Sequence, residues 1–126
     1  MIDRLKDLLS HKYPAGELED LFKETLGYYL EREDPLRADP AERRATRNPR
    51  ARSVPPAIRD EVWRRDESRC TFVSDEGRRC EATRWLELDH IVPWALGGRS
   101  DDAGNIRLLC RTHNQQEARR VFRLEG

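Results

Sequence analysis

The three cysteines of this chain limit what it can fold into more than any other feature of the sequence. Of its 126 residues, 37% are hydrophobic and 38% are charged. Little apolar surface can therefore be buried, and a cross-link that stabilises the fold in addition to the hydrophobic core is expected. Cys70, Cys80 and Cys110 are an odd number, which would leave one cysteine unpaired in a secreted protein. In a reducing compartment disulfides are disfavoured, and metal ligation becomes the better interpretation. A fourth ligand would then come from one of the three histidines.

The charged residues are unevenly distributed along the chain, although its net charge is zero. Residues 1–36 hold five basic and nine acidic side chains, whereas residues 37–69 hold ten basic and six acidic ones. Phosphate binding depends on such local basic clusters rather than on the net charge. The sequence has no apolar run of the roughly 18–20 residues that a membrane-spanning helix needs, and its start lacks the apolar run of a signal peptide. We therefore expect a soluble, cytoplasmic protein with no membrane partner.

The first domain, residues 1–34, is predicted to be a helical hairpin with a solvated acidic face. Apolar residues recur at helical spacing from Ile2 to Leu9 and again from Leu18 to Leu30, and Pro14 separates the two runs. The second helix is expected to end near Pro35. Because so short a hairpin offers its apolar stripe little to pack against, the alternative is a surface through which two copies form a homodimer.

Residues 35–55 differ in composition from the segments on both sides. The stretch is rich in proline, contains almost no apolar side chains and holds six arginines: Arg37, Arg43, Arg44, Arg47, Arg50 and Arg52. We predict a linker with a short helical turn around Ala41–Thr46. The arginines either keep a spacer solvated or form a basic arm along phosphates, in which case Arg43, Arg44 and Arg47 contact nucleic acid.

Residues 56–126 combine short strands with helices, which predicts an α+β domain. Prolines at positions 55 and 56 suit the start of a helix that ends near Asp66. A turn at Asp75-Glu76-Gly77 suggests a hairpin between Cys70 and Cys80. Further along, the patterns predict a strand from Trp85 into Asp89-His90, a second strand over Ile106–Leu109 and a helix from Thr112 to about Phe122.

An ordered string of residues in this domain carries the most specific signal. Asp89-His90 is followed by Pro93, Gly97-Gly98, Asn105, Leu108-Leu109-Cys110 and His113-Asn114. In the segments Leu86–Gly98 (LELDHIVPWALGG) and Asn105–Ala118 (NIRLLCRTHNQQEA), and back through Val62–Cys70 (VWRRDESRC), the sequence resembles the HNH endonuclease family. The resemblance covers roughly residues 54–123. It implies a ββα-metal fold, in which two strands and a helix hold one catalytic ion, and the hydrolysis of DNA phosphodiester bonds.

The resemblance gives chemical roles to the central residues of the string. Hydrolysis of a phosphodiester needs a nucleophile made from water and neutralisation of the charge at the phosphate. Asp89 supplies a carboxylate for Mg²⁺ or Mn²⁺, and His90, which points to the other side of the strand, can act as general base. In relatives, the residue at the position of Asn105 pins the connecting loop and orients the histidine. A plain turn asparagine would also suit the sequence here.

The last residue of the family motif is ambiguous in this sequence. Cys110-x-x-His113 has the spacing of a zinc knuckle, and with Cys70 and Cys80 it makes a Cys₃His set for a structural zinc ion. In that register Asn114 is the third motif residue and a ligand of the catalytic ion. The alternatives make His113 itself that ligand, or leave three buried cysteines unligated. We predict the first arrangement, so the expected fold is an N-terminal helical pair followed by a small ββα-metal (HNH) domain with a structural zinc site.

Further arginines in the second half of the chain are candidates for phosphate contacts. We expect some of Arg99, Arg111, Arg119 and Arg120 to bind nucleic acid, with DNA as the expected partner, and the others to be solvated surface charges. Two non-enzymatic alternatives stay open: a zinc-containing module that binds nucleic acid without cutting it, and a protein-interaction module that dimerises through the helical pair. The presence of both Asp89 and His90 favours the enzyme.

Overall fold

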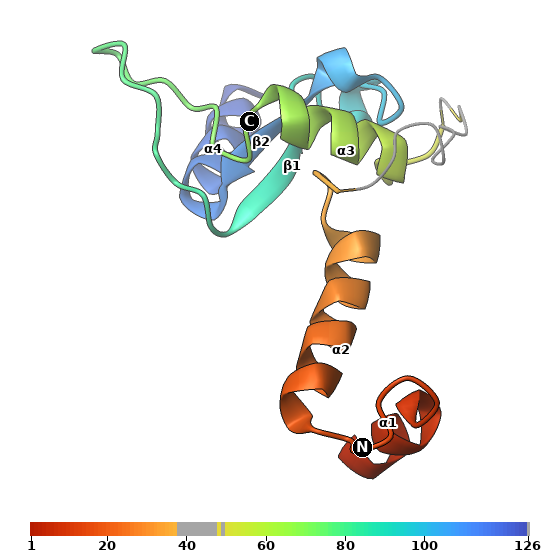
Figure 1. Cartoon of the computed structure of the whole chain (residues 1–126). Coiled ribbons are helices and arrows are strands. Elements are labelled where there is room, and N and C mark those ends of the chain that lie inside the picture. Colours follow the sequence, from red (N-terminus) through yellow and green to blue (C-terminus); the bar gives the residue numbers. More distant parts are fainter. Residues whose placement is uncertain (38–47, 49, 126) are drawn as a thin grey trace. The chain divides into compact units, whose positions relative to one another are not determined.

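The computed structural model describes residues 1–37, 48 and 50–125, with the backbone alone described for residues 124 and 125. The chain divides into two compact units, Met1–Ala38 and Asp39–Gly126, and Figure 1 shows the elements of each. The predicted helical turn at Ala41–Thr46 and the expected nucleic-acid contacts Arg43, Arg44 and Arg47 lie outside the described residues. No helix in the described part of the chain is both long and apolar enough to span a membrane.

The first unit is the predicted helical pair, α1 (Ile2–Leu9) and α2 (Leu18–Glu33). Lys12 and Tyr13 lie in the connection between the two helices. Both donate hydrogen bonds to the Glu24 carboxylate on α2, at 2.7 Å and 3.1 Å. These contacts fix the connection against the longer helix.

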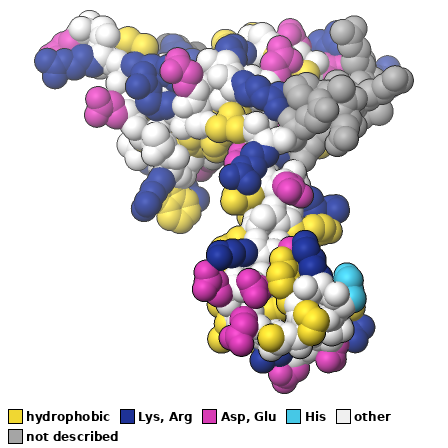
Figure 2. All heavy atoms as spheres, viewed as in Figure 1, with side chains coloured by type: hydrophobic (Ala, Val, Ile, Leu, Met, Phe, Trp, Pro, Cys, Tyr) yellow, Lys and Arg dark blue, Asp and Glu magenta, His cyan; other side chains and the backbone are white. Residues whose placement is uncertain are grey.

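Most of the apolar stripe of this pair is uncovered. Leu21 is the one buried side chain among residues 1–37, whereas Phe22 beside it is 58% exposed. Figure 2 shows hydrophobic side chains of this unit at the surface, among acidic ones. The small size of α1 explains the exposure, because eight residues cannot cover a helix of sixteen.

The second unit is built on a two-stranded antiparallel sheet of β1 (Leu86–His90) and β2 (Ile106–Cys110). In the register of this pair, Asp89 lies opposite Arg107. Both predicted strands are confirmed, but β1 begins after Trp85 rather than at it. The φ of Trp85 is +55°, a left-handed value that cannot continue an extended strand.

Two helices, α3 (Pro56–Arg65) and α4 (Arg111–Glu125), pack against the sheet (Figure 1). The core on the α3 side is formed by Ile58, Val62, Ile106 and Leu108. Because successive side chains of a strand alternate between faces, Asp89 and Arg107 face α4 instead. The predicted helices are confirmed, and α4 extends beyond its predicted limits at both ends.

The sequence predicts a hairpin between Cys70 and Cys80. The structure has a loop there with a tight turn at its tip, and the two sides of the loop are not strands. A single bridge joins Val73 to Arg79. Gly77 makes the turn with a φ of +81°, which glycine adopts without strain. The loop returns the chain to its starting point and so brings the two cysteines together.

Candidate active site and metal centre

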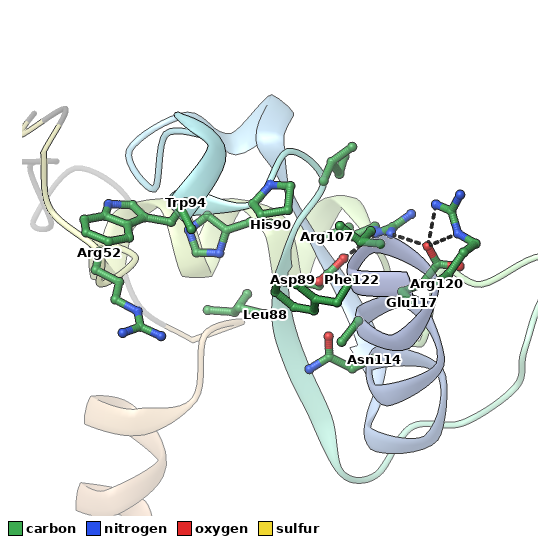
Figure 3. Close-up of a pocket in the computed structure, with 15 residues that line it drawn as sticks. Arg52, Leu88, Asp89, His90, Trp94, Arg107, Asn114, Glu117, Arg120 and Phe122 are labelled. Atoms are coloured by element: carbon green, nitrogen blue, oxygen red, sulfur yellow. Dashed lines mark hydrogen bonds and ion pairs between the residues drawn. The ribbon is translucent and has the colours of Figure 1, made fainter. Parts of the chain in front are cut away.

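A pocket of about 490 Å³ opens where β1, the loop after it, β2 and α4 meet. Its polar and charged lining includes four residues predicted from the sequence: Asp89, His90, Asn114 and Arg120. Figure 3 shows these side chains with Arg52, Arg107 and Glu117, which also line the pocket. Residues from both halves of the family motif therefore meet in one cavity.

The imidazole of His90 belongs to a hydrogen-bond chain that determines which nitrogen carries the proton. His90 Nε2 lies 2.8 Å from Ser100 Oγ, and Ser100 Oγ donates to the Arg52 carbonyl at 2.8 Å. A serine hydroxyl has one hydrogen, so Ser100 must accept from Nε2–H of the neutral ring. The lone pair then lies on Nδ1, the atom able to accept a proton. Ser100 is not among the residues predicted from the sequence, because nothing in the loop sequence marks the one that meets the histidine.

Asn105 closes the loop between the two strands. Its Oδ1 accepts from the Val92 N–H at 2.8 Å, and its Nδ2 donates to the carbonyls of Val92 and Arg99 at 3.1 Å and 3.0 Å. A Cβ on Gly98 would lie 1.7 Å from the Val92 oxygen. A glycine is therefore required at this position, where the backbone at Gly98 lies close to that of Val92. These contacts match the expected pinning of the loop. The described hydrogen bond of the histidine ring is made instead with Ser100, whose Oγ accepts it.

Asp89 forms an ion pair across the sheet with Arg107, whose Nε lies 2.8 Å from Asp89 Oδ2. A second guanidinium nitrogen of Arg107 is 3.6 Å from Glu117 Oε2 on α4. Glu117 also accepts from Arg120 at 2.9 Å. Arg107 and Glu117 are not among the predicted site residues. The signal that could identify Arg107 is the strand register, which places it opposite Asp89.

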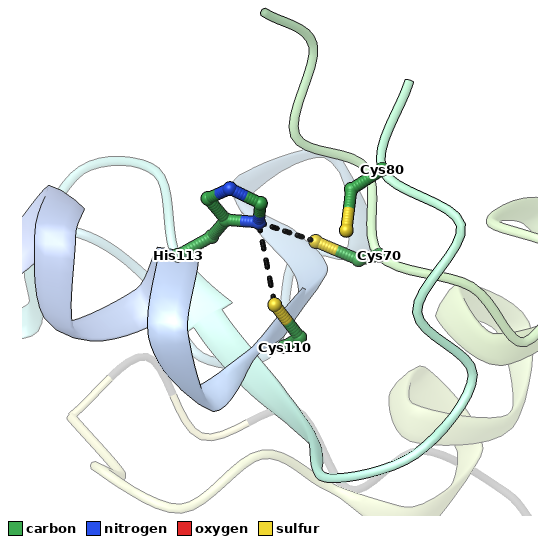
Figure 4. A group of neighbouring side chains, drawn as sticks. All are labelled: Cys70, Cys80, Cys110 and His113. Atoms are coloured by element: carbon green, nitrogen blue, oxygen red, sulfur yellow. Dashed lines mark hydrogen bonds between the residues drawn. The ribbon is translucent and has the colours of Figure 1, made fainter. Parts of the chain in front are cut away.

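Cys70, Cys80, Cys110 and His113 converge at a second point of this unit (Figure 4). One ligand atom from each, three Sγ and one imidazole nitrogen, lie within 4.8 Å of one another. His113 Nδ1 is 3.5 Å from Cys70 Sγ and 3.3 Å from Cys110 Sγ. Three sulfurs and one imidazole suit a tetrahedral structural ion. The cluster is compatible with a structural metal such as zinc.

The surrounding packing holds these ligands in place. Cys110 ends β2 and His113 lies in the first turn of α4. The Phe72 ring stacks on the His113 ring with centroids 3.8 Å apart, and the Cys70 N–H donates to the Ala82 carbonyl at 2.9 Å. Burial raises the pKa of the Cys70 thiol. Because metal binds the thiolate, loading the site would release protons.

Asn114 follows His113 in the chain, but its side chain lines the pocket. Its Nδ2 donates to Glu87 Oε2 on β1 at 2.6 Å. The amide nitrogen is thereby engaged, and the carbonyl Oδ1 is the atom left to bind a cation. The two consecutive residues thus belong to different sites, His113 to the cysteine cluster and Asn114 to the pocket of Asp89.

Four of the arginines predicted to bind nucleic acid lie among the described residues of the second unit: Arg99, Arg111, Arg119 and Arg120. Arg99 pairs with the buried Asp101 through two contacts of 2.7 Å and 2.8 Å. The Arg111 guanidinium lies 4.8 Å from the centre of the exposed Trp85 ring. Arg119 and Arg120 border a hollow on the outer side of α4, and Arg120 lines the pocket as well. Arg120 is therefore the one of these four arginines that lines the candidate catalytic pocket.

Residues 77–120 match the model of the HNH endonuclease family. The matched segment includes all of β1 and β2 and most of α4. Neither the curated proteins nor the solved structures yield a match to this chain. The match to the HNH endonuclease family thus covers the two strands, most of the helix that follows them, and Cys80, Cys110 and His113 of the cysteine–histidine cluster.

Proposed function

We propose that this chain is a metal-dependent endonuclease that hydrolyses phosphodiester bonds in DNA, with His90 as its general base. An HNH domain indicates a nuclease or another nucleic-acid-related function. The observation that carries the proposal is the pocket that Asp89 and Asn114 share with His90, whose Nδ1 is the proton-accepting atom. A base and oxygen ligands for a cation are the groups that this hydrolysis requires.

The oxygen donors of the pocket fit a hard divalent cation. Mg²⁺ keeps several of its waters, and Mn²⁺ also suits oxygen ligands, so one carboxylate and one amide suffice. Asp89 offers the oxygen that Arg107 does not occupy, and Asn114 offers Oδ1. When bound there, the ion would neutralise charge on the scissile phosphate and on the leaving oxygen.

The protein's own groups would move the proton. His90 would take it from the attacking water at Nδ1, while Ser100 holds the opposite nitrogen. The ring is thereby kept in one tautomer and needs no rotation before the transfer. Arg120 would contact a phosphate at the pocket. The products would be a 5′-phosphate and a 3′-hydroxyl, as the family resemblance implies.

A supercoiled-plasmid assay tests the proposal. The purified full chain should nick or linearise the plasmid with Mg²⁺ or Mn²⁺ and leave it intact in EDTA. Retarded but uncut DNA with either ion would support the alternative, a zinc-containing module that binds nucleic acid without cutting it.

The cleavage rate should rise with pH and reach its plateau near neutrality. Burial lowers the pKa of His90; the charge of Asp89 opposes this effect and that of Arg52 adds to it. A protonated imidazole cannot accept a proton, so the rate is lost as the pH falls through this lowered pKa. Single-turnover rates across the acidic range should give a midpoint below the usual histidine value of about 6.5. A midpoint above about 7 would contradict this assignment of the base.

We also propose that the first unit pairs with a second copy through the apolar stripe of α2. Leu18, Phe22 and Leu26 lie on one side of the helix and are 49%, 58% and 59% exposed. An apolar patch of this kind is usually an interaction surface. Light scattering should give the mass of two chains, and Phe22→Asp should reduce it to one. Tyr28→Asp, on another side of the helix, should leave the mass unchanged. A wild type that is monomeric at every concentration would contradict the proposal.

A further inference from the structure

We infer that Arg107 is a positioning residue that holds Asp89 and makes binding of the divalent ion depend on DNA. The inference rests on the proposed function, because it concerns the ion that Asp89 and Asn114 would hold. Arg107 lies on β2 directly opposite Asp89. Figure 3 shows its guanidinium between Asp89 and Glu117, inside the candidate catalytic pocket.

Two ion pairs fix the guanidinium of Arg107. Its Nε lies 2.8 Å from Asp89 Oδ2, and a second nitrogen lies 3.6 Å from Glu117 Oε2. The side chains of Asp89 and Glu117 are 17% and 16% exposed, and that of Arg107 is 30% exposed. Water and salt therefore screen these charges less than they screen charges on an open surface. Arg107 thus orients the Asp89 carboxylate, with one oxygen toward the guanidinium and the other left for a cation.

The charges around the pocket disfavour a cation when DNA is absent. Three arginines and two carboxylates line the pocket, so it carries one net positive charge while His90 is neutral. A guanidinium does not lose its proton in a folded protein. A divalent cation on Asp89 is therefore repelled by Arg107 at close range. The phosphates of DNA bring the missing negative charge, and Arg107 then has an anion to bind beside the ion.

Calorimetric Mn²⁺ titrations of the zinc-loaded full chain, with and without a short DNA duplex, test this inference. All proteins in these titrations carry His90→Ala, so that the duplex stays intact. The protein with this substitution alone is called the parent. DNA should raise the Mn²⁺ affinity of the parent on the order of tenfold. Arg107→Gln should raise the DNA-free affinity by about the same factor and remove most of the gain from DNA, because the repelling charge is gone. Arg107→Lys keeps the charge and should resemble the parent.

Two further variants complete the design. Arg123→Gln removes an exposed charge of α4 that does not line the pocket, and its DNA-free affinity should equal that of the parent. Glu117→Gln should lower the DNA-free affinity several-fold, because Arg107 loses a counter-charge. Zinc content and circular dichroism report whether each variant is folded.

The outcomes separate this inference from the proposed function. A folded Arg107→Gln variant with unchanged or lower DNA-free affinity shows that Arg107 only supports the structure, and overturns the inference alone. If Arg107→Gln does not fold, Glu117→Gln decides, and an unchanged DNA-free affinity there overturns the inference. A parent that binds no Mn²⁺, with or without DNA, overturns the ion site of the proposed function and this inference with it.

Discussion

Replacing His90 with alanine should slow DNA cleavage by roughly 10²–10⁴-fold, the usual effect of losing a general base. The Nδ1 of this ring can accept a proton because Nε2 keeps its hydrogen and donates it in a hydrogen bond to Ser100. Alanine has no group that could accept the proton. Zinc content and DNA binding should not change, because the ring is outside the cysteine cluster. Single-turnover plasmid cleavage measures the rate, and metal analysis and gel retardation measure the other two properties.

His11→Ala is the matched control, because His11 carries the same side chain in the first unit. This variant should cut at the wild-type rate. If His90→Ala also cuts at that rate, His90 is not the base, although the proposal that the chain is a nuclease would survive.

His113→Ala should lose the structural ion and, with it, the folded state of the second unit. Among the described residues of this unit, the fully buried large aliphatic side chains are few: Ile106, Leu108, Leu109 and Val62. A structural zinc site contributes about 10–16 kcal/mol to folding in zinc-finger peptides, far more than so small a core can spare. Metal analysis and thermal unfolding followed by circular dichroism measure the two losses.

Asn114→Ala is the matched control for that variant, one residue along the chain. Its side chain lines the pocket rather than the cluster, so this variant should keep its zinc and its fold and lose cleavage. The contrary result would be a His113→Ala variant that stays folded, keeps its zinc and does not cut. His113 would then be the third motif residue in place of Asn114.

Features that depend on local spacing or on residue type could be predicted from the sequence. Apolar periodicity indicated the first helix, and the run of apolar residues from Ile2 to Leu9 coincides with α1, because an amphipathic helix repeats over a few residues. The cysteine–histidine cluster followed from ligand chemistry, since Cys110-x-x-His113 needed two more sulfurs and the chain has only two others. The helix is predicted from residues that are neighbours in the chain, and the cluster is predicted from the few residue types that can bind zinc. Neither prediction needs the tertiary structure.

Contacts made by the folded loops and by the strand register could not be predicted in this way. Ser100 meets His90 ten positions away only after the loop has folded back. Arg107 meets Asp89 across eighteen positions, and a shift of one residue in register would turn it to the other face. The left-handed φ of Trp85 could not be predicted either, because tryptophan is a residue type that is common in strands.

The junction of β2 and α4 has a practical consequence for anyone who purifies this protein. Cys110 and His113 belong to the cysteine–histidine cluster, and the next residue, Asn114, lines the pocket. If the proposed zinc site and nuclease activity hold, a molecule without zinc would lose the contacts that position Asn114, and incomplete loading would divide a preparation into active and inactive molecules. The activity measured per milligram of protein would then reflect the fraction of molecules that hold the ion rather than the turnover rate of a loaded molecule. Batches would then be comparable only after normalisation to bound zinc.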